Sequence, residues 1–351
     1  MFLFVGFREH WDIRRLTEPC HCDSGLTIKL MTRFYDPSVI KKANCIIFVL
    51  DRRVNHSDGL WELLHKYRTP FQRWLYATRE SPTTAKMLIP PDKFRYAFHW
   101  SFTYHSMATF YKPYGRYLEY KTFSEIDRKY LDGKTKFLSW TSSHCGPSVP
   151  WKRRAFVLEL AKYIPVDMYG SCGNLSCSRD TQKSLEKCHA LMERYKFALA
   201  LENSCCSEYI TEKFWNALRF FQVPVVFGAP KSDFEKIAPP HSYIHLEDFD
   251  SVQALAEHLL LVDNENWMYE AYHAWRSHGN IRRAKMPDDL IVSCQSQCLV
   301  ADRLDDTRTE GSERPLFDIL GDTWYNSCRD CQRIANNLIE KPRQRNVSLI
   351  L

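Results

Sequence analysis

A chain of 351 residues is longer than one compact core usually needs, so we expect two domains of about 100 to 200 residues each. Apolar residues make up 44% of the chain and charged residues 26%, which excludes a disordered protein, a collagen-like fibre and a coiled coil. The net charge of +6 arises in residues 1–134, which hold 22 basic and 14 acidic side chains. These basic residues are scattered singly and no nucleic-acid-binding motif accompanies them, so we expect no nucleic-acid partner.

The first part of the chain predicts short strands that alternate with helices. Apolar runs of buried-strand length lie at Phe2–Val5, Cys45–Leu50 and Trp74–Thr78, and Gly59–Tyr67 predicts a helix. This alternation is typical of an α/β domain. The polar stretch 125–136 is where we expect this domain to end.

The second part predicts a parallel, doubly wound sheet, because strand and helix patterns alternate repeatedly. We expect strands at 136–140, 166–169, 197–201, 223–227 and 243–246, and helices at 151–163, 209–221 and 251–262. Ser251 is placed to cap the last of these helices. Beyond Arg276 the pattern weakens, and residues 301–315 predict a polar loop or insertion.

No apolar stretch approaches the length of about 18 residues that a membrane-spanning helix needs. The runs Met1–Val5, Cys45–Leu50 and Leu259–Val262 have at most six residues. We therefore expect no membrane anchor in this chain. The charged residues that follow Phe7 interrupt the first run too early for a signal peptide, so we interpret it as a strand.

Thirteen cysteines are many for a reducing cytosol and indicate a chain of the secretory pathway. The odd number requires at least one thiol that is not paired within the chain. Glycosylation sequons at Asn55, Asn174 and Asn346 agree with a lumenal protein. A zinc site is the alternative for the closely spaced cysteines, but no second CxxC pair lies at a usable spacing, so disulfides are favoured.

The densest chemical signal follows the expected strand at 197–201. A polar loop leads into Thr211, Glu212 and Lys213 at the start of a helix. The unpaired amides of a helix N-terminus favour a phosphate, to which Thr211 can donate a hydroxyl proton and Lys213 adds a positive charge. The alternative is that these residues only cap and solvate the helix.

The run Tyr195–Pro230 reads YKFALALENSCCSEYITEKFWNALRFFQVPVVFGAP, and PPHSYIHLEDF follows at Pro239–Phe249. Together they resemble the donor-binding signature of the α-1,3-fucosyltransferases, glycosyltransferase family 10. Blocks similar to other family motifs occur in family order: RESP at 79–82, W-x3-Y-x8-PYG at 100–115, SHC at 143–145, RRAFVLEL at 153–160, VDMYGSCG at 166–173 and CRDC at 328–331. The resemblance covers roughly residues 1–335.

The resemblance implies an α/β fold of the GT-B type, in which two Rossmann-like domains face a cleft. It divides the chain into an acceptor-side domain at 1–130, a GDP-fucose-binding domain at 131–290 and a C-terminal segment with cysteine pairs at 291–351. In that segment, Cys328 and Cys331 resemble the short C-terminal disulfide of the family.

The implied reaction moves L-fucose from GDP-fucose to a GlcNAc hydroxyl of a glycoprotein or glycolipid glycan, with inversion. Four residues match family positions that contact GDP-fucose: Asn203, Tyr209, Glu212 near the ribose and Lys213 on the phosphates. Arg153 matches a second phosphate-binding cation. Two fixed cations and helix amides can stabilise the charge that grows on the departing diphosphate. We therefore expect no required cofactor, although Mn²⁺ could stimulate the reaction.

Glu80 matches the general base, which takes the proton of the acceptor hydroxyl. The alternative from the residues alone is a surface carboxylate beside the Ser81-Pro82 turn. Asp248-Phe249-Asp250 mimics the metal-binding D-x-D of other glycosyltransferases, but we do not expect it to hold a metal ion in this family.

The acceptor-side block departs from the family pattern, because His105 and Met107–Thr109 replace an Arg and two carboxylates. Its aromatic residues Trp100, Tyr104 and Tyr114 suit either a core or a sugar-binding face. Two alternatives to the main hypothesis follow: a protein O-fucosyltransferase of the same family, and a non-catalytic GDP-fucose- or glycan-binding member. Family members are typically Golgi proteins with one N-terminal anchor, so we expect the Golgi lumen, with membrane attachment only through an anchor absent from this chain.

Overall fold

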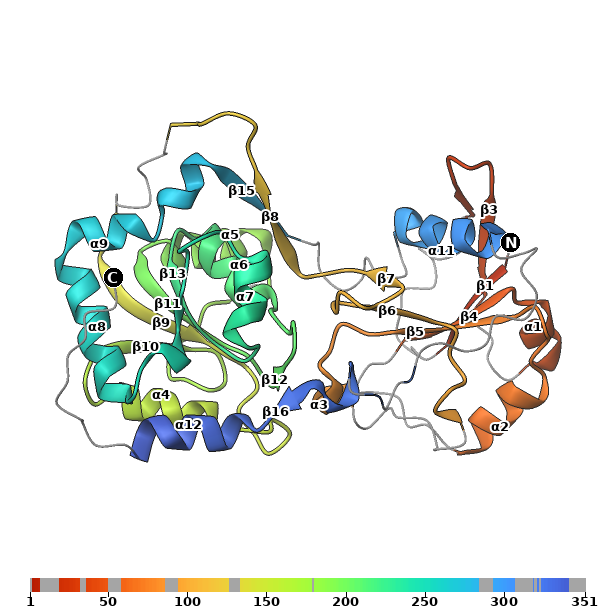
Figure 1. Ribbon diagram of the computed structural model, residues 1–351, viewed down its shortest axis with the longest axis horizontal. Coiled ribbons are helices and arrows are strands. Elements are labelled where there is room, and N and C mark those ends of the chain that lie inside the picture. Colours follow the sequence, from red (N-terminus) through yellow and green to blue (C-terminus); the bar gives the residue numbers. More distant parts are fainter. Residues whose placement is uncertain are drawn as a thin grey trace. The chain divides into compact units, whose positions relative to one another are not determined.

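The computed structural model describes residues 2–6, 19–31, 36–49, 58–85, 94–125, 133–178, 180–283, 293–306, 318, 321 and 323–340 (Figure 1). The chain forms two compact units. Unit 1 comprises Met1–Pro113 and Ala284–Cys328, and unit 2 comprises Tyr114–Arg283 and Arg329–Leu351. The chain thus first passes between the units at residue 113, whereas the sequence predicted a boundary near residue 130. No helix within the described ranges is long and apolar enough to cross a membrane.

A seven-stranded sheet forms the centre of unit 1, in the order β2-β3-β1-β4-β5-β6-β7. Its neighbouring strands are parallel except for β2, which pairs antiparallel with β3. The expected strands near residues 2, 45 and 74 are confirmed as β1, β4 and β5, and the expected helix as α2. The elements are β1 (Phe2–Gly6), β2 (Cys20–His21), β3 (Thr27–Met31), α1 (Pro37–Lys42), β4 (Cys45–Val49), α2 (Asp58–Lys66), β5 (Arg73–Ala77), α3 (Pro82–Ala85), β6 (Trp100–Thr103), β7 (Phe110–Tyr111) and α11 (Cys294–Asp306).

Helix α11 returns to unit 1 from the C-terminal part of the chain. Val300, Ala301 and Leu304 are buried in the same core as strands β4 and β5. Disulfides Cys20–Cys294 and Cys22–Cys298 fasten the helix to β2 and the turn that follows it. The prediction of a loop at 301–315 is therefore wrong for residues 301–306, which belong to α11 because the apolar face of this helix packs against the core. Residues 307–315 lie outside the described ranges.

Unit 2 contains a five-stranded parallel sheet in the order β10-β9-β11-β13-β14 (Figure 1). All five strands and the three helices expected in this part are present, and Ser251 caps α8 as predicted, since its hydroxyl accepts the N–H of Ala254 at 3.1 Å. The elements are β8 (Gly115–Glu119), β9 (Lys136–Thr141), α4 (Arg153–Leu160), β10 (Val166–Tyr169), α5 (Gln182–Met192), β11 (Tyr195–Leu201), β12 (Cys205–Cys206), α6 (Glu212–Arg219), β13 (Val223–Phe227), α7 (Lys231–Ile237), β14 (Ile244–His245), α8 (Val252–Asn264), α9 (Asn266–Ala271), β15 (Gly279–Arg283) and α12 (Cys331–Glu340).

Successive side chains of β11 point to opposite faces of this sheet, and both faces are covered, as is usual for a parallel sheet. Phe197, Leu199 and Leu201 belong to one core, with side chains of α4, α8 and α12. Ala200 belongs to the other core, with side chains of α6 and α7. The helical spacing of Phe214, Trp215, Leu218 and Phe221 predicts one buried stripe. The first three are buried in this second core, but Phe221 lies beyond the end of α6 and packs against the first core.

The disulfide pattern of unit 2 corrects one expectation. Cys331 pairs with Cys205, so the predicted bridge between Cys328 and Cys331 is wrong. Cys331 starts α12 and is buried beside the sheet, where it reaches the loop that follows β11. Disulfides Cys145–Cys172 and Cys177–Cys188 also lie in unit 2. Cys45 in β4 is the free, buried thiol that the odd number of cysteines requires.

Candidate functional site

The order of the sheet in unit 2 places a ligand site between β9 and β11. From β9 the chain first adds β10 on one side and then crosses back to add β11 on the other. Loops at the carboxyl ends of two such strands diverge, and doubly wound proteins bind their ligands in the crevice that results. The predicted donor residues of unit 2 come from exactly the segments that follow these two strands, and from α4 and α6.

Arg153 joins the carboxyl ends of β9 and β11. Its side chain is 1% exposed, and its guanidinium donates one hydrogen bond to the carbonyl of Leu201 at 3.1 Å and another to the carbonyl of His144. Leu201 ends β11, and His144 lies in the loop after β9. The predicted phosphate-binding cation thus lies at the switch point, where it also holds the two loops together.

Lys213 belongs to a hydrogen-bonded cluster at the start of α6. Its ammonium group donates to the Glu202 carboxylate at 3.0 Å and to the Thr211 hydroxyl at 2.8 Å. Glu202 also accepts the backbone N–H of Thr211 at 2.7 Å and the Thr211 hydroxyl at 2.8 Å. Because the Thr211 proton goes to Glu202, its predicted use as a phosphate donor does not fit this arrangement.

The charges in this cluster keep Lys213 protonated. Burial lowers the pKa of Lys213, but the carboxylates of Glu202 and Glu212 outweigh it, so the pKa is raised. The charge of Arg153 opposes this rise, which indicates that the two cations lie near each other. Burial raises the pKa of Glu202 in spite of the nearby Lys213. Lys213 therefore stays protonated, and its ammonium group is held by the buried carboxylate of Glu202.

The amides of the first turn of α6 complete the candidate anion site. Thr211 is the N-cap residue, but its side chain does not cap the helix. The Glu212 carboxylate accepts the N–H of its own residue, and the other N–H groups of the first turn can bind an anion or water. The helix dipole adds to the charge of Lys213 at the same place.

The other predicted donor residues surround this cluster. Asn203 is half-buried directly after Glu202, and within the described ranges no hydrogen bond to its side chain is found. Tyr209 is 2% exposed and contacts the ring of Tyr114, with ring centroids 6.4 Å apart. The Glu212 side chain is 39% exposed and is the most accessible carboxylate of the cluster, which suits the predicted contact with a ribose.

Glu80, the predicted base, lies in unit 1 just after β5. Its backbone N–H donates to the Thr78 hydroxyl at 3.1 Å, and its side chain is half-buried. The Ser81 hydroxyl and the backbone N–H of Thr84 form the next turn, at the start of α3. These bonds fix the backbone from the strand end to the helix, as a positioned side chain requires.

In the block that departs from the family pattern, the aromatic residues of β6 and its end are buried, whereas the replaced residues Met107 and Thr109 are exposed. Trp100 and Tyr104 are each 2% exposed, so they are core aromatics and not an open sugar-binding face. The Nδ1 atom of His105 accepts the backbone N–H of Met107 at 3.2 Å. The Met107 side chain, where the family pattern has a carboxylate, is 72% exposed.

Comparison with known proteins identifies the family. Residues 131–318 match the model described as glycosyltransferase family 10 (fucosyltransferase) C-term, and residues 4–115 match the model described as fucosyltransferase, N-terminal. The chain belongs to glycosyltransferase family 10. Glycoprotein 3-alpha-L-fucosyltransferase A of Drosophila melanogaster is 42% identical over 205 residues, which are 57% of this chain and 39% of the fly protein. Alpha-(1,3)-fucosyltransferase C of the same organism is 31% identical over 306 residues, 81% of this chain and 67% of that protein.

Solved structures support the fold of this family 10 member. The crystal structure of an alpha1,3-fucosyltransferase with GDP-fucose superimposes with a TM-score of 0.53 at 14% sequence identity, covering 89% of this chain and 92% of that chain. At this identity the likeness concerns the fold, which is of the GT-B type.

Glu202 is a residue of the site that the sequence interpretation did not assign. It lies inside the family 10 signature, between Leu201 and the predicted Asn203. A carboxylate at the end of a buried apolar strand is costly unless it is paired, which is the signal that could have identified it. Its partner Lys213 lies eleven residues later, so the strand pattern alone did not reveal the pair.

In the D-x-D triplet of this family 10 chain, the first aspartate forms an ion pair with a lysine. The Asp248 carboxylate lies 2.5 Å from the ammonium group of Lys231. In the described part of the chain, no group of three or more His, Cys, Asp and Glu side chains is arranged to hold a metal ion.

Gly228 lies directly against the buried carboxylate. A Cβ atom at this position would lie 2.6 Å from the Cβ and 2.8 Å from the Cγ of Glu202, and φ of +149° disfavours other residues there. We expect Gly228→Ala to lower the free energy of unfolding by about 1–3 kcal/mol and to weaken GDP binding, because Glu202 must move away from Lys213.

Denaturant unfolding and calorimetric titration with GDP measure these two effects. Gly146→Ala is the matched control, since its Cβ would meet nothing within 4 Å. Unchanged GDP affinity in a destabilised Gly228→Ala variant would show that Glu202 does not position the donor cation.

Proposed function

We propose that this protein is an inverting α-1,3-fucosyltransferase that moves L-fucose from GDP-fucose to a hydroxyl of a GlcNAc-containing glycan on glycoprotein or glycolipid. The observation that carries the proposal is the cluster at the start of α6, where Lys213 is held by Glu202 and lies near Arg153. Membership of family 10 and the names of the two fly relatives, both of them fucosyltransferases, support the same reaction.

On the donor side, the diphosphate of GDP-fucose binds at the first-turn amides of α6 and at Lys213. Arg153 adds the second positive charge, and Glu212 and Asn203 contact the ribose and fucose side of the donor. When the bond between fucose C1 and the β-phosphate oxygen breaks, its electron pair stays on that oxygen. The fixed cations stabilise the new charge without reorganising at that moment.

On the acceptor side, Glu80 is the general base. The acceptor hydroxyl oxygen attacks fucose C1 from the face opposite GDP, so that one bond forms as the other breaks and the configuration at C1 inverts. The hydroxyl proton moves to the Glu80 carboxylate. We also propose a Golgi lumen location, to which the disulfides found in units 1 and 2 lend support.

The test is transfer of labelled fucose from GDP-fucose to a panel of acceptors. The panel contains N-acetyllactosamine, an N-glycopeptide with its innermost GlcNAc, and a folded glycan-free protein domain, and NMR of each product identifies the linkage. We expect an α-1,3 linkage to GlcNAc in at least one glycan. Label on a protein hydroxyl would favour a protein O-fucosyltransferase instead, and GDP-fucose binding without any transfer would favour a non-catalytic member; either result overturns the proposal.

A further inference from the structure

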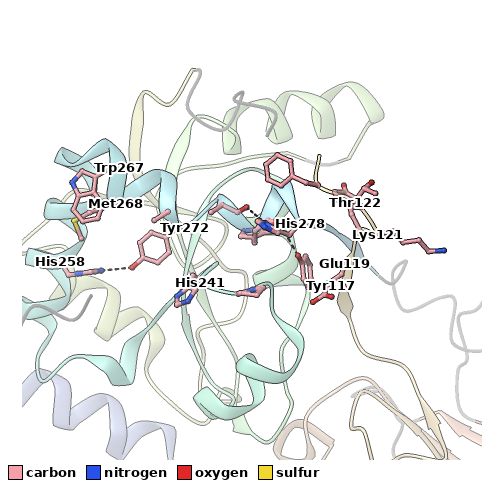
Figure 2. A pocket seen from close by; sticks show the side chains of 16 residues that line it. Tyr117, Glu119, Lys121, Thr122, His241, His258, Trp267, Met268, Tyr272 and His278 are labelled. Carbon is pink, nitrogen blue, oxygen red and sulfur yellow. Dashed lines mark hydrogen bonds between the residues drawn. The ribbon is translucent and has the colours of Figure 1, made fainter. Parts of the chain in front are cut away.

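Unit 2 contains a pocket of about 860 Å³ that shares no residue with the donor site. Its walls come from the end of β8 and the chain that follows it, from the loop before β14, and from α8, α9 and the turn that follows α9 (Figure 2). The volume lies within the range of about 300–1,000 Å³ that is typical of sites for small organic ligands.

This pocket lies toward the amino ends of the strands, whereas the donor site lies at their carboxyl ends. Pro240 and His241 directly precede β14. Helix α8 starts after the carboxyl end of β14 and runs back along the sheet, so α9 follows it at the amino-end edge. In Figure 1, α9 and β15 accordingly lie at the opposite end of unit 2 from β12. The pocket cannot be a part of the donor site.

Exposed aromatic rings line the pocket. Trp267 is 60% exposed, Phe123 71% and Tyr120 42%, and all three belong to the wall. Figure 2 shows Trp267 and Tyr272 on one side and Tyr117 with Glu119 on the other. Flat aromatic faces that carry polar groups at their edges suit the C–H faces and hydroxyl edges of a sugar ring better than a flexible aliphatic chain.

The polar groups of the wall are mostly uncharged donors and acceptors. The His258 imidazole and the Tyr272 hydroxyl share a hydrogen bond of 3.1 Å. Burial lowers the pKa of His258 and raises the pKa of Tyr272 to about 12, so both are neutral near pH 7. The single Glu119 and Lys121 balance each other in charge. The Nε1 atom of Trp275, another wall residue, is buried without a hydrogen-bond partner in the described part of the chain.

From this combination of aromatic faces, neutral hydrogen-bonding groups and zero net charge, we propose that the pocket is a second carbohydrate site that binds a neutral oligosaccharide. Trp267 provides the stacking face, and the His258–Tyr272 pair hydrogen bonds to sugar hydroxyls. The site needs no GDP-fucose and stands independently of the proposed function. In a glycosyltransferase it would hold a part of a glycan that is remote from the reacting hydroxyl.

Titration calorimetry of the full chain tests this proposal with three soluble probes: chitobiose, N-acetyllactosamine and mannotriose. The titrations are done with saturating GDP, so that the donor site is filled. We expect at least one sugar to bind, and Trp267→Ala to weaken its binding about tenfold through loss of one stacking face. Tyr272→Phe, which removes a single hydroxyl and tests the same site without a change of shape, is expected to weaken binding by a smaller factor.

Tyr163→Ala is the matched control, because Tyr163 is a 46% exposed aromatic residue outside the pocket. It is expected to bind sugar as the unmodified chain does. No binding by any of the three sugars, or equal affinity of Trp267→Ala and the unmodified chain for the sugar, would overturn the proposal. A chain that binds sugar in this Trp267-dependent way but transfers no fucose would contradict the proposed function and leave the second site in place.

Discussion

Lys213→Met is expected to abolish fucose transfer and to lower the free energy of unfolding by about 3–5 kcal/mol. The Glu202 side chain is 1% exposed, and the described structure pairs it with the ammonium group of Lys213. Removal of this cation leaves a buried carboxylate without its countercharge, and it also removes the charge that the donor diphosphate requires. Activity should fall by at least 10³-fold, as expected when a preorganised charge is lost.

A double variant separates the structural effect from the functional one. Glu202→Gln combined with Lys213→Met removes both charges, so it should recover most of the lost stability. Two neutral side chains cost less free energy to bury than a single carboxylate without its countercharge. It should not recover GDP binding or transfer. Denaturant unfolding gives the stability, and titration calorimetry gives the GDP affinity.

Lys236→Met is the control for the loss of a lysine charge. Its side chain is 64% exposed, and its ammonium group lies 3.4 Å from the carboxylate of the buried Asp233, which also accepts the backbone N–H of Glu208. Because solvent screens the exposed ammonium group, this contact is expected to contribute little. The control should keep both stability and activity. A Lys213→Met variant that binds GDP with unchanged affinity would refute the role assigned to the cluster, whatever its stability.

Glu80→Gln is expected to lower kcat by about 10²–10⁴-fold with little change in the KM for GDP-fucose. The amide keeps the shape of the side chain but cannot accept the acceptor proton. The donor cluster lies in unit 2 and is not altered. Steady-state rates at varied GDP-fucose and saturating acceptor, with GDP affinity measured separately, give both parameters.

Glu62→Gln provides the matched control, because Glu62 is an exposed carboxylate of α2 in the same unit. This variant should be fully active. Equal kcat for Glu80→Gln and the unmodified chain would remove Glu80 from the mechanism. A rise in the KM for GDP-fucose with unchanged kcat would indicate that Glu80 binds the donor and does not take a proton.

Local patterns predicted the regular elements of the sheets well. The buried strands at 197–201 and 223–227 form continuous apolar runs, and such runs have few alternatives to the interior of a parallel sheet. The start of one helix was predicted wrongly: the expected helix at 209–221 begins only at Glu212. Tyr209 and Ile210 are buried in the loop before it, where side-chain packing outweighs local helical preference.

Contacts between distant residues could not be predicted from periodicity. The buried guanidinium of Arg153 donates to the carbonyl at the end of β11 and to a carbonyl in the loop after β9, and nothing in the local sequence of α4 indicates those partners. The pairing of Cys331 with Cys205 likewise depends on α12 packing beside the sheet of unit 2. For Lys213 the family motif predicted a phosphate-binding cation. It did not predict that the carboxylate of Glu202 binds the ammonium group of Lys213.

The disulfides of unit 1 have a consequence for how the protein is made. Cys20–Cys294 and Cys22–Cys298 join residues 274 and 276 positions apart. At a synthesis rate of about 5–20 residues per second, the first cysteines wait roughly 14–55 seconds for their partners. The bridges Cys145–Cys172 and Cys177–Cys188 span only 27 and 11 positions and can close within that time.

During synthesis, the two short bridges in the middle of the chain can therefore close first, whereas the bridges of unit 1 and Cys205–Cys331 must wait for the C-terminal part of the chain. While they wait, Cys20 and Cys22 are exposed to thiol–disulfide exchange with every cysteine that emerges before Cys294. Recombinant yield should consequently depend on a disulfide isomerase in the producing compartment more than on the intrinsic stability of either unit.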